Sequence, residues 1–187
     1  LWGWIPPEMA VVDPAALHVN LPTGRFGTGP DDRDRQKEAA EKIDELREQF
    51  RLALQYHELV RAAGDDGSPP RPDPHLAALA AYASGERPVV IHAQRHGDIL
   101  AAIEFAEELE LNWILADAAE AWKCVDALKE HDVRVLLGPS MQLPASRNDP
   151  YDATYSTAAR LHAAGVRFAI KAVDEGPGSA TSTRNLP

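Results

Sequence analysis

From residue 88 onward, short apolar runs alternate with longer stretches in which apolar residues recur at helical spacing. The apolar runs, which predict strands, cover residues 88–93, 112–117, 133–139 and 166–174. The amphipathic stretches, which predict helices, cover residues 98–110, 118–132 and 150–165, and the last ends at Gly165. Nearly continuous hydrophobic runs are typical of parallel strands buried on both faces, and such strands need crossover connections. The pattern therefore predicts parallel strands joined by helices.

The first 87 residues have a less regular pattern. Residues 31–64 read as one long helix, with acidic residues in its first turn where they suit the positive end of the helix dipole. Its apolar positions predict a buried stripe made of Ile43, Leu46, Phe50, Leu54 and Leu59, and its many charges predict a solvated opposite face. A Pro-rich loop at 65–74 and a short helix at 74–85 follow. Residues 15–30 allow one more strand and a Gly/Pro-rich loop.

Two architectures fit this array: an open doubly wound sheet, or a stretch of a (β/α)8 barrel. A full barrel takes about 250 residues, whereas the chain has 187. We therefore expect an α/β fold that is a partial TIM-type barrel, with a long N-terminal helix. Residues 1–87 would be a variable segment of the same domain, and residues 88–187 would be its regular βα repeats.

The charge and composition of the chain limit the classes of partner that we expect. The net charge of −10 gives no basic surface for nucleic acid, and no run of about 18 apolar residues exists to span a membrane. No signal peptide is visible, and the single cysteine, Cys124, excludes an internal disulfide. The chain opens at Leu1 and closes on STRNLP, so we expect a fragment cut at both ends. We expect a small-molecule substrate, no nucleic acid and no membrane; a homo-oligomer and the compartment stay open.

Polar residues gather where the predicted strands end. Ligands sit at the carboxyl ends of the strands in both architectures, and these ends carry His92, Asp117, Lys171 and Asp174. A lone histidine on a buried strand is often a hydrogen-bonded core residue, whereas its place at a carboxyl end favours a ligand; both interpretations of His92 stay open. Asp117 reads as the N-cap of the next helix. Phosphate-binding loops, a nucleophile elbow and paired cysteine ligands are absent from the sequence.

The remaining polar candidates read as the rim of a pocket or as structural residues. The turn after the first of these strands supplies Arg95 and His96, and Asp98 is expected to start the following helix. Specificity is expected to lie in the loops at 138–149 and 175–184. The histidines taken as structural or exposed are His18, His57, His75, His131 and His162.

Three segments carry a resemblance to a known family. They are VVIHAQRHGDILAAIEFAEEL (89–109), DPYDATYSTAARLHAAGVRFAI (149–170) and VDEGPGSATSTRNLP (173–187). Together they make residues 88–187 similar to the later barrel half, strands five to eight, of the amidohydrolase superfamily, specifically its imidazolonepropionase-like proteins. The segments LWGWIPPEMA and AALHVNLP resemble the variable middle of the same family more loosely.

The resemblance implies metal ligands. His92 matches the fifth-strand metal-binding histidine, and Asp174 matches the eighth-strand aspartate that binds metal and helps to activate the attacking water. It implies a divalent ion, zinc or iron, in the complete parent, which neutral imidazole and carboxylate suit. Apart from the resemblance, we expect a substrate-binding or rim role for Arg95, His96, Asp117, Arg147 and Arg184.

The sequence departs from the family at several ligand positions. It contains no H-x-H pair, Asp117 stands near the usual sixth-strand histidine, and the fourth-strand lysine has no clear match. Lys171 occupies a place where a small residue is more usual. We therefore expect a fragment of a metal-dependent amidohydrolase that cleaves an amide or cyclic amide C–N bond, with weak or no metal binding and impaired activity in this chain alone. The alternative is a non-catalytic α/β binding or scaffold domain.

Overall fold

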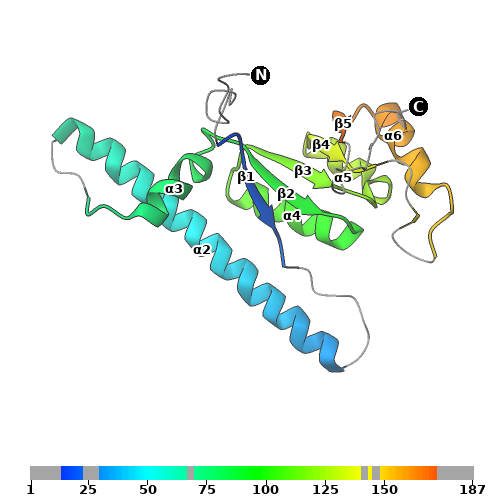
Figure 1. Cartoon of the computed structure of the whole chain (residues 1–187), viewed down its shortest axis with the longest axis horizontal. Helices are drawn as coiled ribbons and strands as arrows, with labels where there is room; N and C mark the ends of the chain where they lie inside the picture. The colour runs from blue at the N-terminus through cyan, green and yellow to red at the C-terminus, as the bar shows by residue number, and fades with distance from the viewer. Residues whose placement is uncertain (1–13, 23–29, 67–69, 140–142, 145–147, 172–187) are drawn as a thin grey trace, which may run out of the picture.

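The computed structural model describes residues 14–22, 30–66, 70–139, 143–144 and 148–171 (Figure 1). The strands are β1 (Leu17–Asn20), β2 (Val89–Ala93), β3 (Trp113–Asp117), β4 (Val135–Leu137) and β5 (Phe168–Ile170). The helices are α2 (Pro30–Asp66), α3 (Pro74–Ala83), α4 (His96–Glu108), α5 (Val125–Glu130) and α6 (Ala153–Ala164), with a 3-10 turn, η1, at Ala121–Lys123. The strand predicted within 15–30 is therefore confirmed as β1.

The sheet decides between the two predicted architectures. Its five described strands are all parallel and lie side by side in chain order, β1-β2-β3-β4-β5. A doubly wound sheet reverses its strand order at a switch point, whereas a barrel adds each new strand next to the preceding one. The chain therefore has an α/β fold with the strand order of a partial TIM-type barrel.

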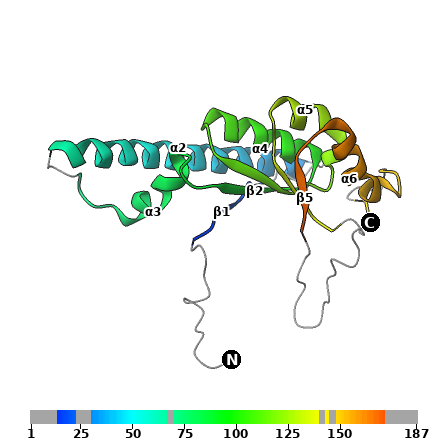
Figure 2. The same ribbon diagram turned by 90° about the horizontal axis from the view of Figure 1, so that it is seen from above.

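The helices α2, α4 and α5 cover one face of this sheet (Figure 2). Along β2 the side chains of Val89, Ile91 and Ala93 are buried in the core that these helices share with the sheet. Side chains alternate along a strand, so Val90 and His92 point to the opposite face, which we call the open face. This face corresponds to the interior of a barrel, and it is the side seen in Figure 1.

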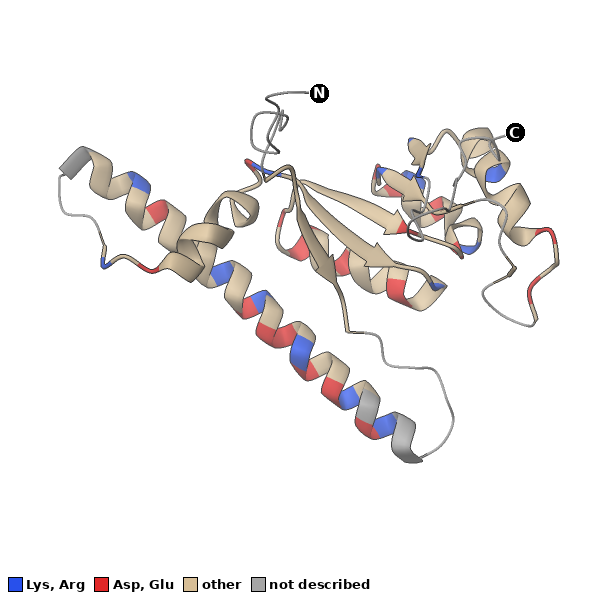
Figure 3. Ribbon diagram, viewed as in Figure 1, with Lys and Arg blue, Asp and Glu red and all other residues tan. Residues whose placement is uncertain are grey.

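The long helix α2 is confirmed, with 37 residues that would span about 55 Å. Phe50 is buried against Phe105 of α4, in an edge-to-face contact between ring centroids 5.9 Å apart. Leu59, which we predicted in the buried stripe, is 58% exposed, so that part of the prediction is wrong. Charged residues of both signs alternate along the rest of the helix, as Figure 3 shows. None of the described helices is both long enough and apolar enough to cross a membrane.

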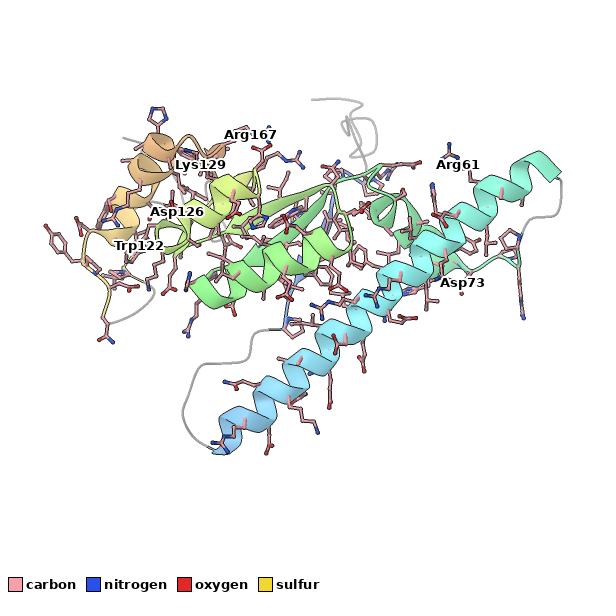
Figure 4. All side chains as sticks on the ribbon, turned by 180° about the vertical axis from the view of Figure 1, so that it is seen from behind. Arg61, Asp73, Trp122, Asp126, Lys129 and Arg167 are labelled. Atoms are coloured by element: carbon pink, nitrogen blue, oxygen red, sulfur yellow. The ribbon has the colours of Figure 1, made fainter. Side chains whose placement is uncertain are left out.

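Several helix ends differ from the sequence prediction. The expected helix at 118–132 is divided into η1 and the short α5, whose N-cap is Cys124, so Asp117 is not a helix N-cap. α4 begins at His96, which places Asp98 in its first turn rather than at its start. Gly165 ends α6 in the left-handed conformation, as predicted. Asp73, labelled in Figure 4, caps α3 by accepting hydrogen bonds from the backbone N–H groups of residues 75 and 76.

Candidate functional site

Four polar side chains join in a row across the carboxyl edge of the sheet. His92 Nδ1 lies 2.5 Å from Asp117 Oδ2, and Asp117 Oδ1 lies 2.6 Å from Lys171 Nζ. On the other side of the imidazole, His92 Nε2 lies 2.9 Å from His18 Nδ1. The row thus runs from β1 through β2 and β3 to the residue after β5, and we call it the carboxyl-edge row.

Strand register explains how distant residues meet here. His92 is paired with Asn20 of β1 and with Ala116 of β3, so β1 and β3 flank it on either side. His18 lies two residues before Asn20 and therefore faces the same side of the sheet as His92. Ala116 is paired with Leu136 of β4, and Leu136 is paired with Ala169 of β5, so Ala169 lies in register with His92. Lys171 lies two residues after Ala169. Alternation therefore brings His18, His92 and Lys171 to the open face.

Asp117 enters the row through an uncommon backbone conformation. Its φ is 72°, in the left-handed region, where aspartate is one of the few side-chain-bearing residues tolerated. If side chains simply alternated along β3, the side chain of Asp117 would point to the helix-covered face, like the buried Leu115. The left-handed residue ends β3, and its carboxylate instead contacts both His92 and Lys171. Strained positions of this kind cluster at functional sites.

The electrostatics of the row keep Asp117 ionised. Burial disfavours the charged carboxylate, yet hydrogen bonds from Lys171 and His92, together with their charges, hold the pKa of Asp117 below its usual value. The three side chains are only partly buried, with 23% of His92, 23% of Asp117 and 28% of Lys171 exposed. Part of each of these side chains is therefore open to solvent.

The donor set allows a test of whether a metal ion fits. No group of three or more His, Cys, Asp and Glu side chains that could hold a metal forms within the described ranges. Two imidazole nitrogens, His18 Nδ1 and His92 Nε2, do face each other, and a carboxylate lies behind His92. Metal-binding histidines usually donate their other ring N–H to such a carboxylate. The described residues thus fit a metal through two nitrogens, and further ligands would have to come from elsewhere.

A second polar group, the loop cluster, lies next to the row and is more deeply buried. Lys123 Nζ contacts Glu120 Oε1 at 2.9 Å and Asp149 Oδ1 at 2.7 Å, and the two acidic side chains are only 9% and 8% exposed. Glu120 Oε2 also accepts a hydrogen bond from the backbone N–H of His96, and the Glu120 N–H donates to the Gln94 carbonyl. The cluster therefore ties together the loops that follow β2, β3 and β4. Burial disfavours the charged lysine, but its hydrogen bonds to both acids raise the pKa of Lys123.

A small cavity lies on the helix side of Asp117. Its volume is about 20 Å³, and its walls come from the ends of β3, β4 and β5 and from Thr154 and Thr157 of α6. A volume of this size has room for about one water molecule. It is too small to hold a substrate.

The structure brings only some of the predicted site residues together. His92 and Asp117 are in contact, while Arg95 and His96 are exposed around the start of α4. Asp174, Arg147 and Arg184 lie outside the described residues, so a convergence of His92 with Asp174 stays a prediction. We took His18 as structural or exposed; it is exposed, and its contact with His92 was missed. The alternation in LHVN, with Val19 buried and His18 exposed, was the available signal.

Comparisons with known proteins bear on the fold and on the family. No protein-family model matches the chain. No match was found among curated proteins. Among solved structures, the chain is similar to an amidohydrolase from Thermotoga maritima MSB8, with a TM-score of 0.67 and 25% sequence identity. The likeness covers 89% of this chain and 43% of that protein, so the chain spans less than half of its length. This finding supports the amidohydrolase superfamily, which the sequence motifs indicated.

Proposed function

We propose that these residues form part of the site of a metal-dependent amidohydrolase that cleaves an amide or cyclic amide C–N bond of a small molecule. The observation that carries the proposal is the arrangement around His92, whose Nδ1 faces a carboxylate and whose Nε2 faces a second imidazole nitrogen on the open face. Active-site residues of (β/α)8 barrels lie at this edge of the sheet. The structural likeness to an amidohydrolase supports this choice of reaction class.

The ligands in this proposal are His92 through Nε2, His18 through Nδ1, and Asp174. Two nitrogens and a carboxylate suit zinc or iron(II). Such an ion, when bound, lowers the pKa of a bound water and polarises the carbonyl group of the substrate. Catalytic sites commonly use three protein ligands and an open position. Because the sequence has no H-x-H pair, we propose that further ligands belong to a larger protein and that this chain alone binds metal weakly.

The other residues of the proposed site hold protons and bind the substrate. Asp174, besides holding the metal, would accept a proton from the attacking water, and Asp117 accepts a hydrogen bond from the Nδ1–H of His92. Arg95, His96, Arg147 and Arg184 are proposed to line the rim, where their positive or polar groups contact the substrate. The rim role given to Asp117 is replaced, because its carboxylate already contacts His92 and Lys171.

A variant of His92 tests the proposal. The full protein, loaded with zinc or iron(II), is assayed for hydrolysis of linear and cyclic amides, and metal binding is measured by calorimetry. His92→Asn should lower both metal affinity and hydrolysis by at least about 10- to 100-fold, since substitutions merely behind a ligand already have effects of that size. His162→Asn, an exposed position on α6, is the matched control. Metal-independent binding of small molecules without hydrolysis would instead support the scaffold alternative.

A further inference from the structure

We infer that Asp117 and Lys171 form a positioning pair that fixes the tautomer of His92, with the proton on Nδ1 and the lone pair on Nε2, where it faces His18 on the open face. The observation is the unbroken series of contacts Lys171–Asp117–His92–His18. The inference rests on the proposed function only where it assigns a metal ion to His92 Nε2. The tautomer itself follows from the hydrogen bonds alone.

The direction of each hydrogen bond follows from whether each group can donate or accept a hydrogen bond. The ammonium of Lys171 has donors and no acceptor, so it donates to Asp117 Oδ1. The carboxylate of Asp117 accepts from the Lys171 ammonium through Oδ1 and has no proton to donate, so Oδ2 must accept a hydrogen bond from His92 Nδ1–H. A neutral imidazole carries one N–H, which leaves Nε2 of His92 as an acceptor. His18 Nδ1, 2.9 Å away, must then be the donor to it. The protons of both rings are thereby assigned in the metal-free protein, and metal binding through His18 Nδ1 would require the His18 proton to move to its Nε2.

Lys171 matters because it decides which way the side chain at 117 is turned. It lies beyond β5 and reaches Asp117 of β3 across the end of β4. A carboxylate has two equivalent oxygens, so this direction has no visible effect in the natural protein. An asparagine at 117 would reveal it, because an amide has one oxygen and one NH₂ group. Lys171 can bond only to the oxygen, and that leaves the NH₂ group facing His92 Nδ1.

Asp117→Asn should therefore invert the tautomer of His92. The NH₂ group donates to Nδ1, which must give up its proton, and the proton moves to Nε2. His18 Nδ1 must then become the acceptor, with the proton of His18 on its own Nε2. Asparagine tolerates the left-handed conformation nearly as well as aspartate, so the backbone at 117 should be kept. In the double variant Asp117→Asn/Lys171→Met nothing holds the amide oxygen, the amide can turn either end toward His92, and part of the Nδ1–H tautomer should return.

The test is long-range ¹H–¹⁵N NMR of the histidine rings in the full, metal-free protein at pH about 8.5, where imidazoles are ordinarily neutral. His92 should be protonated on Nδ1 in the natural protein and on Nε2 in Asp117→Asn, and Nδ1–H should be partly regained in the double variant. Asp126→Asn, an exposed aspartate on α5 that Figure 4 labels, is the control and should leave His92 unchanged. Should Asp117→Asn not fold, Asp117→Gly keeps the left-handed residue and removes the acceptor, so both tautomers should appear.

Two results would overturn the inference: an unchanged Nδ1–H tautomer in Asp117→Asn, or a double variant that behaves like the single one. A metal titration then separates this inference from the proposed function. If His92 is a ligand, Asp117→Asn should weaken metal binding about 10- to 100-fold, and Lys171→Met in the same chain should restore part of it. Inverted tautomers without any metal binding would uphold the positioning pair and reject the metal-dependent reaction.

Discussion

The two edges of the sheet both carry charged residues, but they use them differently. At the carboxyl edge, the exposed His18 and the partly buried His92, Asp117 and Lys171 bond to one another across the strands. At the amino edge, Arg134 donates to the Asn112 side chain and to the Trp113 carbonyl, and Arg167 pairs with Asp132 in solvent. Arg167 is labelled in Figure 4.

The difference in contacts indicates that the amino edge serves stability and that the carboxyl edge suits chemistry. Contacts at the amino edge join a side chain to a neutral group, or join two exposed charges at little desolvation cost. The carboxyl edge removes charges from water, and a buried ion pair is weak evidence of stabilisation because its desolvation cost is high. A fold selected for stability alone could place apolar groups there, so we take the polar carboxyl edge as functional.

The largest expected effect concerns Glu120 of the loop cluster. Glu120→Ala removes a buried acid from Lys123 and leaves the His96 backbone N–H without its acceptor. Breaking a buried ion pair typically costs 3–5 kcal/mol, and because Lys123 keeps Asp149 we expect a loss of about 3 kcal/mol in the free energy of unfolding. Urea denaturation measures it.

The control for Glu120 is Glu58→Ala, at an exposed position of α2, which should change the unfolding free energy by less than about 0.5 kcal/mol. Equal losses in both variants would mean that the loop cluster contributes no more than a solvated acid. The loop cluster would then give no support to the difference between the two edges.

The sequence was informative wherever local pattern decides structure. Hydrophobic runs predicted the strands, and the spacing of apolar residues predicted α2, α4 and α6. Gly165 predicted the end of α6 because a helix end often needs a residue in the left-handed conformation, which glycine adopts easily. The contacts of the site were predicted less well. Asp117 was assigned to a helix N-cap because a cap and a left-handed strand end use the same residue type. His18 and His92 are 74 positions apart, and only the register of β1 on β2 brings them together.

At the amino edge, Arg134→Met should destabilise the protein by about 1–2 kcal/mol, since it removes hydrogen bonds to two neutral acceptors. Methionine keeps much of the apolar stem of the arginine, so the loss reports mainly on the guanidinium. Thermal unfolding at several urea concentrations measures it. Metal affinity and the His92 ring signals should not change, and a change in either would show that the two edges are coupled.

A smaller effect should appear only in acid. The pKa of Asp117 is lower in the folded protein than its ordinary value of 3.8, so its ionisation stabilises the fold above that pH. The contribution is lost as the pH falls below 3.8 and through the folded pKa, because the unfolded chain takes up the proton first. The unfolding free energy of Asp117→Asn should therefore differ from that of the natural protein at pH 6 and converge with it in this acidic range. A difference that persists unchanged at lower pH would contradict the assignment of an ionised Asp117.

The smallest effect is expected at the exposed pair of the amino edge. Arg167 and Asp132 lie 2.6 Å apart with side chains 61% and 81% exposed, and pairs in this setting contribute about 0.2–1 kcal/mol. Arg167→Gln should therefore cost at most about 0.5 kcal/mol, and a double-mutant cycle with Asp132→Asn isolates the pair. Because solvent ions screen exposed charges, the coupling should shrink further in 1 M NaCl. A coupling above about 1.5 kcal/mol that resists salt would show that the amino edge holds its charges as tightly as the carboxyl edge, and the polarity of the carboxyl edge would no longer argue for a site there.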